Sequence, residues 1–186
     1  MFAIDDALAE IVASTTQPAL GAIRLAWWGE ALTRLDSGVP PPEPRLRAAS
    51  AELLSRGVSG ARLATLGEGW AAMLEEEADF SLIAERGAAL FAVAATLLGC
   101  ADPRLAEAGR LYALADGARR GFKPPRAASD ALCASLKGHR FAPALRPLTA
   151  LARLGARDLR NARQEPEANP ARAIALLAHR FSGFVV

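Results

Sequence analysis

The chain has 186 residues, with 22 Lys and Arg against 20 Asp and Glu, which gives a formal net charge of +2. This length is enough for one domain with a sizeable core, and the scattered, mildly positive charge gives no argument for a nucleic-acid partner. The two cysteines, Cys100 and Cys133, match no metal-binding spacing and fit a reduced compartment. Because the first residues, MFAIDDALAE, are too acidic for a signal peptide, we expect a cytoplasmic protein.

Strong helix formers dominate the sequence, and the alternation typical of strands is missing. In chain order, the pattern predicts helices over residues 2–15, 18–35, 44–56, 60–78, 80–99, 103–121, 127–137, 141–163 and 168–181. Proline-rich breaks at 37–44, 122–130 and 165–170 are too short to separate two domains, so we expect one all-α domain over residues 1–186. The longest apolar run, AALFAVAATLLG, is too short to span a membrane and predicts a buried helix.

The first predicted helix carries Asp5, Asp6 and Glu10. Asp6 and Glu10 are four residues apart and so share a helix face. Carboxylates at this spacing can hold Mg²⁺ against a diphosphate, because this hard ion prefers oxygen ligands. Acidic residues near the start of a helix also suit the positive end of its dipole, so the structural alternative stays open.

The second predicted helix contains LGAIRLAWWGEAL, residues 20–32. Leu20, Ile23 and Trp27 follow one another at i, i+3 and i+7, which predicts a stripe that faces the core. Trp28 lies on a neighbouring face with Arg24, within reach of a cation–π contact.

Three consecutive segments, FAIDDALAEIV, ASTTQPAL and GAIRLAWWGEAL, form an acidic helix, a short polar turn and a G-x-x-R-L-x-W-W helix. Together they resemble the squalene/phytoene synthase family of head-to-head trans-isoprenyl diphosphate synthases, most closely its divergent branch near the respiratory complex I assembly factor. WAAMLEEEADFSLI, AERGAALFAVAATLLG and EAGRLYALADGARRG resemble later helices of the family at lower specificity. The resemblance implies a single-domain helical bundle of the isoprenoid-synthase type, with a central cavity and Trp28 near its wall.

Active members of this family bind Mg²⁺ between two aspartate-rich motifs, and the ions assist the departure of the substrate diphosphate. The resemblance implies Asp5, Asp6, Glu10 and Asp116 as metal ligands if the chain is active. It also makes Arg24, Arg119 and Arg120 candidates for binding diphosphate.

Two departures from the family pattern point away from catalysis. Arg120 stands four residues after Asp116, where the family has a metal ligand, and this favours an Asp116–Arg120 ion pair within the helix. The chain also starts almost at the first motif, so we expect an N-terminally shortened member of the family.

We therefore expect a catalytically degenerate family member that binds a lipid-like ligand or a protein partner, as the assembly-factor branch implies. One alternative is an active Mg²⁺-dependent prenyltransferase that condenses two prenyl diphosphates. The other is an unrelated helical interaction domain, which predicts no central cavity and Asp6 on the outer surface. We expect no membrane span, and a peripheral membrane contact stays open.

Overall fold

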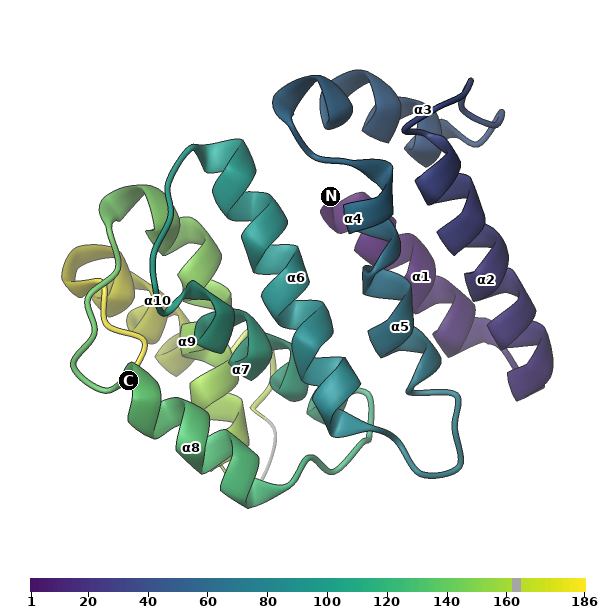
Figure 1. Ribbon diagram of the computed structural model, residues 1–186. Coiled ribbons are helices and arrows are strands. Elements are labelled where there is room, and N and C mark those ends of the chain that lie inside the picture. The colour runs from purple at the N-terminus through teal and green to yellow at the C-terminus, as the bar shows by residue number, and fades with distance from the viewer. Residues whose placement is uncertain (162–164) are drawn as a thin grey trace.

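The computed structural model describes residues 1–161 and 165–186, and over these residues it is all α-helical, without strands (Figure 1). The all-α class predicted from the sequence is thus confirmed. The helices are α1 (Phe2–Ser14), α2 (Pro18–Arg34), α3 (Pro44–Glu52), α4 (Gly60–Ala64), α5 (Leu66–Ala71), α6 (Phe80–Leu98), α7 (Leu105–Arg119), α8 (Arg126–Leu136), α9 (Arg146–Arg160) and α10 (Pro170–Ser182). Short 3-10 turns, η1 (Leu54–Arg56) and η2 (Pro143–Leu145), follow α3 and precede α9.

Local sequence determines where many of these helices start. Pro18, Pro44 and Pro170 occupy the first turns of their helices, where a missing N–H leaves no hydrogen bond unmade. At the start of α6, the side chain of Asp79 accepts hydrogen bonds from the backbone N–H groups of Ser81 and Leu82. The predicted helix positions therefore agree closely with the structure in most of the chain.

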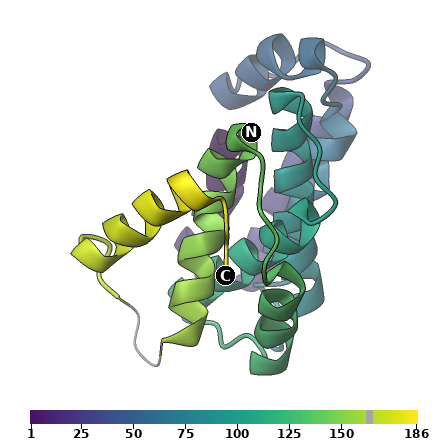
Figure 2. The ribbon, with the colours of Figure 1, turned by 90° about the vertical axis from the view of Figure 1, so that its left-hand side faces the viewer.

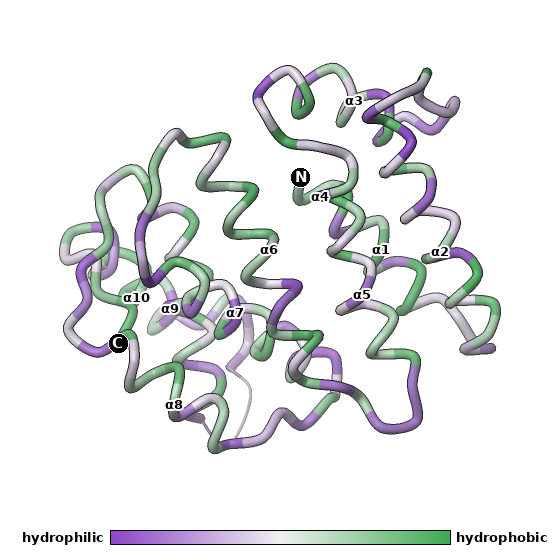
Figure 3. The backbone as a smooth tube through the Cα atoms, viewed as in Figure 1, coloured by the Kyte–Doolittle hydropathy of each residue, from purple (hydrophilic) through white to green (hydrophobic). Residues whose placement is uncertain are grey.

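The single helix predicted over residues 60–78 is wrong. This stretch forms the two short helices α4 and α5, and the chain leaves the helical conformation after Ala71. Glu75, Glu76 and Glu77 follow, and three adjacent negative charges are unfavourable at the negative end of a helix dipole. These acids lie in the hydrophilic loop between α5 and α6 (Figure 3). The last residues of the helix predicted over 141–163 lie outside the described part of the chain.

Helices α6 and α7 form the centre of the molecule, with α1–α5 on one side and α8–α10 on the other (Figure 1). One hydrophobic cluster joins the first group to this central pair and includes Leu32 and Trp70; the other joins the last group to it and includes Phe141 and Val185. The backbones of α6 and α7 come very close at two glycines. A Cβ added to Gly87 would lie 2.0 Å from the carbonyl oxygen of Gly109, so no larger residue fits at this spacing.

Helix α6 is long and apolar enough to cross a membrane by length and composition alone. Half of its most apolar window is buried inside the fold, and core helices of soluble proteins meet the same criterion, so the indication of a span is weak. The predicted burial of this segment is confirmed for Leu90, Phe91 and Val93, which are fully buried.

Candidate functional site

The buried side chain of Arg86 joins two of the carboxylates to which the family resemblance gives a metal-binding role. Arg86 projects from α6, and its side chain has no exposed surface. Its Nη1 donates to both carboxylate oxygens of Asp5, at 3.0 and 2.9 Å, and its Nη2 donates to Oδ2 of Asp116 at 2.7 Å. One guanidinium on α6 thus links the first helix to α7.

Trp70 and Arg120 complete this group, which we call the Arg86 cluster: Asp5, Trp70, Arg86, Asp116 and Arg120. The indole Nε1 of Trp70 donates to Oδ1 of Asp5 at 2.7 Å, and the guanidinium of Arg86 lies 3.9 Å from the centre of the indole ring. The guanidinium of Arg120 lies 4.7 Å from the same ring and donates to Asp116 at 3.1 Å. The helix ion pair predicted between Asp116 and Arg120 is therefore confirmed.

The charges of the Arg86 cluster balance, with two carboxylates and two guanidinium groups. Burial by itself would lower the pKa of Arg86, but the charges of Asp5 and Asp116 outweigh it and raise the pKa above its ordinary value. The neighbouring phenol of Tyr112 is affected in a related way: burial, and then the charges of Asp116 and Asp5, raise the pKa of Tyr112 to about 12. The cluster thus keeps Arg86 charged and the neighbouring Tyr112 neutral.

The geometry does not fit a magnesium site built from the four predicted ligands. The space between Asp5 and Asp116 holds the guanidinium of Arg86, a cation that competes directly with a metal. Asp6 and Glu10 do share one face of α1, as predicted, but that face is exposed. Glu10 forms a two-pronged ion pair there with Arg45 of α3, at 3.0 and 3.1 Å. Within the described residues, no group of three or more His, Cys, Asp or Glu side chains is arranged to hold a metal.

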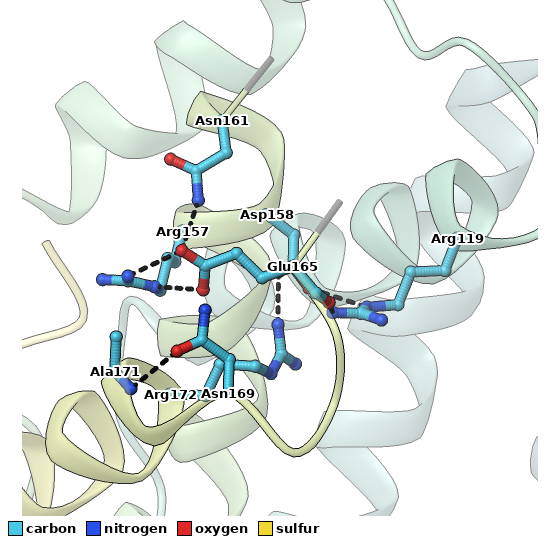
Figure 4. A network of polar contacts seen from close by, with 8 residues as sticks. All are labelled: Arg119, Arg157, Asp158, Asn161, Glu165, Asn169, Ala171 and Arg172. Carbon is cyan, nitrogen blue, oxygen red and sulfur yellow. Dashed lines mark hydrogen bonds and ion pairs between the residues drawn. The ribbon is translucent and has the colours of Figure 1, made fainter. Parts of the chain in front are cut away.

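The three arginines proposed to bind diphosphate lie in different surroundings. Arg24 is exposed on α2, and Arg120 belongs to the Arg86 cluster. Arg119 donates to Asp158 of α9 at 2.7 Å, and Asp158 also pairs with Arg172 of α10 (Figure 4). Arg119 and Arg120 are thus engaged in ion pairs between and within helices.

A second ion-pair group lies beside Asp158. Arg157 donates to both carboxylate oxygens of Glu165 at 2.7 Å, and Asn161 adds a hydrogen bond of 3.1 Å (Figure 4). Together with Asp158, these contacts tie α7, α9 and the start of α10 together.

The prediction that Leu20, Ile23 and Trp27 face the core is wrong. Their exposed fractions are 52%, 65% and 48%, whereas Trp28 is only 8% exposed and belongs to the core. Helix α2 has a second apolar stripe, containing Leu25, Trp28 and Leu32, and it is this stripe that the fold buries. The rings of Trp27 and Trp28 meet edge to face, 5.7 Å apart.

The sequence interpretation overlooked the two residues at the centre of the cluster, Trp70 and Arg86. Arg86 follows Ile83 by three residues and precedes Leu90 by four, so it lies on the apolar stripe of its helix. A cation on such a stripe needs a buried acidic partner. A search for an acidic partner of Arg86 would therefore have pointed to Asp5 on α1 and Asp116 on α7.

No protein-family model, curated protein or solved structure matches this chain. The resemblance of residues 2–35 to squalene/phytoene synthases, the isoprenoid-synthase type of the bundle and its central cavity therefore stay predictions. The site is defined by its own geometry: a buried, charge-balanced ion-pair cluster at the junction of α1, α5, α6 and α7.

Proposed function

We propose that this protein is a non-catalytic binding protein on a helical frame of the squalene/phytoene synthase type. The observation that carries the proposal is the guanidinium of Arg86, which takes both Asp5 and Asp116 as partners. In an active prenyltransferase these carboxylates would have to be available for Mg²⁺. Here they neutralise a buried arginine, so their role is to hold α1, α6 and α7 together.

The position of Asp6 also supports a non-catalytic role. Asp6 is exposed, whereas Asp5 and Asp116 pair with Arg86, and the alternative of an unrelated helical interaction domain also expects Asp6 on the outer surface. The non-catalytic family member and the unrelated helical domain both have a binding role, and they differ only in the origin of the fold. The apolar residues left exposed on α10 are the feature of the surface that suits binding a lipid-like ligand or a protein partner.

The decisive experiment measures Mg²⁺-dependent release of diphosphate from farnesyl and geranylgeranyl diphosphate. We expect no release above the protein-free background, while an active phytoene synthase assayed in parallel gives a signal. Asp6→Asn is the matched variant, because it removes a predicted ligand from an exposed position without disturbing the core. Release by the wild type that disappears in Asp6→Asn would contradict the proposal and establish the prenyltransferase alternative.

A further inference from the structure

Helix α10 exposes its apolar side. Ile174, Leu177 and Phe181 lie at i, i+3 and i+7 along the helix, with exposed fractions of 68%, 58% and 71%. Ala173 and Ala178 flank them and are also exposed. The described surface of this helix thus consists almost entirely of apolar side chains, with Arg180 as the exception.

The polar side chains of α10 hold the helix in this orientation. Arg172 is 7% exposed and pairs with Asp158 of α9, and His179 is 1% exposed. The ring of His179 forms hydrogen bonds of 2.9 Å with the hydroxyl of Thr149 and the carbonyl of Phe184. Turning the apolar stripe inward would break these contacts, so the stripe is fixed on the outside.

The surroundings of the stripe are positively charged. The described residues of this region, 137–161 and 165–186, contain eight Lys and Arg against three Asp and Glu, whereas residues 1–136 contain thirteen against seventeen. Three arginines gather at the C-terminal end of α10, next to Phe181. Arg146 donates to the carbonyls of Arg180 and Phe181, at 2.8 and 3.1 Å, and Arg140 donates to the carbonyl of Ser182 at 2.7 Å.

The shape of α10 and its neighbours also suits a lipid surface. The helix packs on α9 and stands out from the rest of the molecule (Figure 2). A hollow of about 450 Å³ between the two helices lies beside the stripe, and Pro143, Pro147, Leu176 and Phe181 are among its lining residues. Arg146 and Arg180 also line this hollow, so an apolar space is bordered by cations.

We propose that α10 docks the protein onto a membrane surface rich in anionic phospholipid. Ile174, Leu177 and Phe181 enter the boundary between headgroups and acyl chains, and Arg140, Arg146 and Arg180 lie at the level of the phosphates. An exposed apolar helix face bordered by cations is the pattern of helices that lie in the membrane interface. A second copy of the chain is a poorer occupant, because its positively charged surface would repel this one.

Flotation of the protein with vesicles tests the proposal. We expect binding to vesicles of equal parts phosphatidylcholine and phosphatidylglycerol, at least about tenfold weaker binding to phosphatidylcholine alone, and a steep loss of binding with added salt. The triple variant Ile174→Gln/Leu177→Gln/Phe181→Gln should lose this binding. Arg180→Glu should also lose most of this binding. Because it changes a single exposed residue, it keeps the test valid if the triple variant does not fold.

Helix α2 offers the matched control. Leu20, Ile23 and Trp27 repeat the same spacing and similar exposure on a helix outside the positively charged region, so the variant Leu20→Gln/Ile23→Gln/Trp27→Gln should still bind. Circular dichroism checks that each variant is folded. Three results would overturn the proposal: no binding of the wild type to anionic vesicles, loss of binding in the α2 variant alone, or a dimer in sedimentation that the α10 substitutions dissociate.

Discussion

Arg86 has two acidic partners, Asp5 and Asp116, and both are held largely away from solvent because they neutralise its buried charge. A guanidinium without exposed surface needs compensation for its lost hydration, and two carboxylates together with the face of Trp70 supply it. Arg120 then balances the second negative charge. The residues of the cluster are therefore mutually dependent, and removing one carboxylate leaves the buried charge of Arg86 only partly compensated.

Tyr112 reports on this environment, because it is the only tyrosine in the chain. Its pKa is raised to about 12, so the folded protein should keep the phenol protonated at about pH 10.5, where a free tyrosine is mostly ionised. Since the unfolded chain loses this proton first, the free energy of unfolding should fall as pH rises from about 10 towards 12. Phenolate absorbance measures the ionisation of Tyr112, and unfolding followed by circular dichroism at each pH measures the free energy of unfolding. Ionisation of the folded protein near pH 10 would contradict the assigned burial of Tyr112.

The two adjacent tryptophans of α2 differ in burial, so their substitution should affect stability differently. Trp28→Ala should lower the free energy of unfolding by about 3 kcal/mol or more, because Trp28 is buried in the core. Trp27→Ala should lower it by about 1 kcal/mol, the worth of an exposed edge-to-face contact. Urea denaturation of both variants checks the order, and a loss below about 1 kcal/mol for Trp28→Ala would show that its ring is not a core element.

At the scale of elements, α2 shows why its orientation could not be predicted from its own sequence. The helix has two apolar stripes, Leu20–Ile23–Trp27 and Leu25–Trp28–Leu32, and each is compatible with a buried face. The packing of α1, α4 and α5 decides between them. A close approach at Gly21 on the buried side, where an added Cβ would lie 2.8 Å from a side-chain carbon of Leu74, agrees with that choice.

The close contact between α6 and α7 depends on the glycines at its centre. Gly87→Ala should lower the free energy of unfolding by about 3 kcal/mol or more, because its Cβ would overlap backbone atoms of Gly109 and force the helices apart. Gly29→Ala is the matched change in α2, where nothing lies within 4 Å of the added carbon. It should raise stability by about 0.5–1 kcal/mol through helix propensity. Thermal or urea unfolding compares the two, and similar small effects would mean that α6 and α7 are not in such close contact.

At the scale of the whole molecule, the helices were predictable because their signals are local: prolines in first turns, capping side chains and an abundance of helix formers. The functional site was predictable only in part. Asp5 and Asp116 were singled out as metal ligands and not as ion-pair partners, and Arg86, which binds both, comes from a third helix more than eighty residues after Asp5. Long-range pairs of this kind depend on the tertiary arrangement, which periodicity in a single helix does not contain.

Asp5 holds a buried arginine and is not kept free for a metal, and the measurement that tests this role is urea unfolding of Asp5→Asn compared with Asp6→Asn. These neighbours differ in burial and partners, so the same chemical change probes two roles. We predict that Asp5→Asn loses about 3–5 kcal/mol, because it breaks a buried ion pair. Asp6→Asn should change stability by less than about 0.5 kcal/mol. Small and equal effects for both variants, together with stabilisation of the wild type by Mg²⁺, would show instead that Asp5 is free to bind a metal.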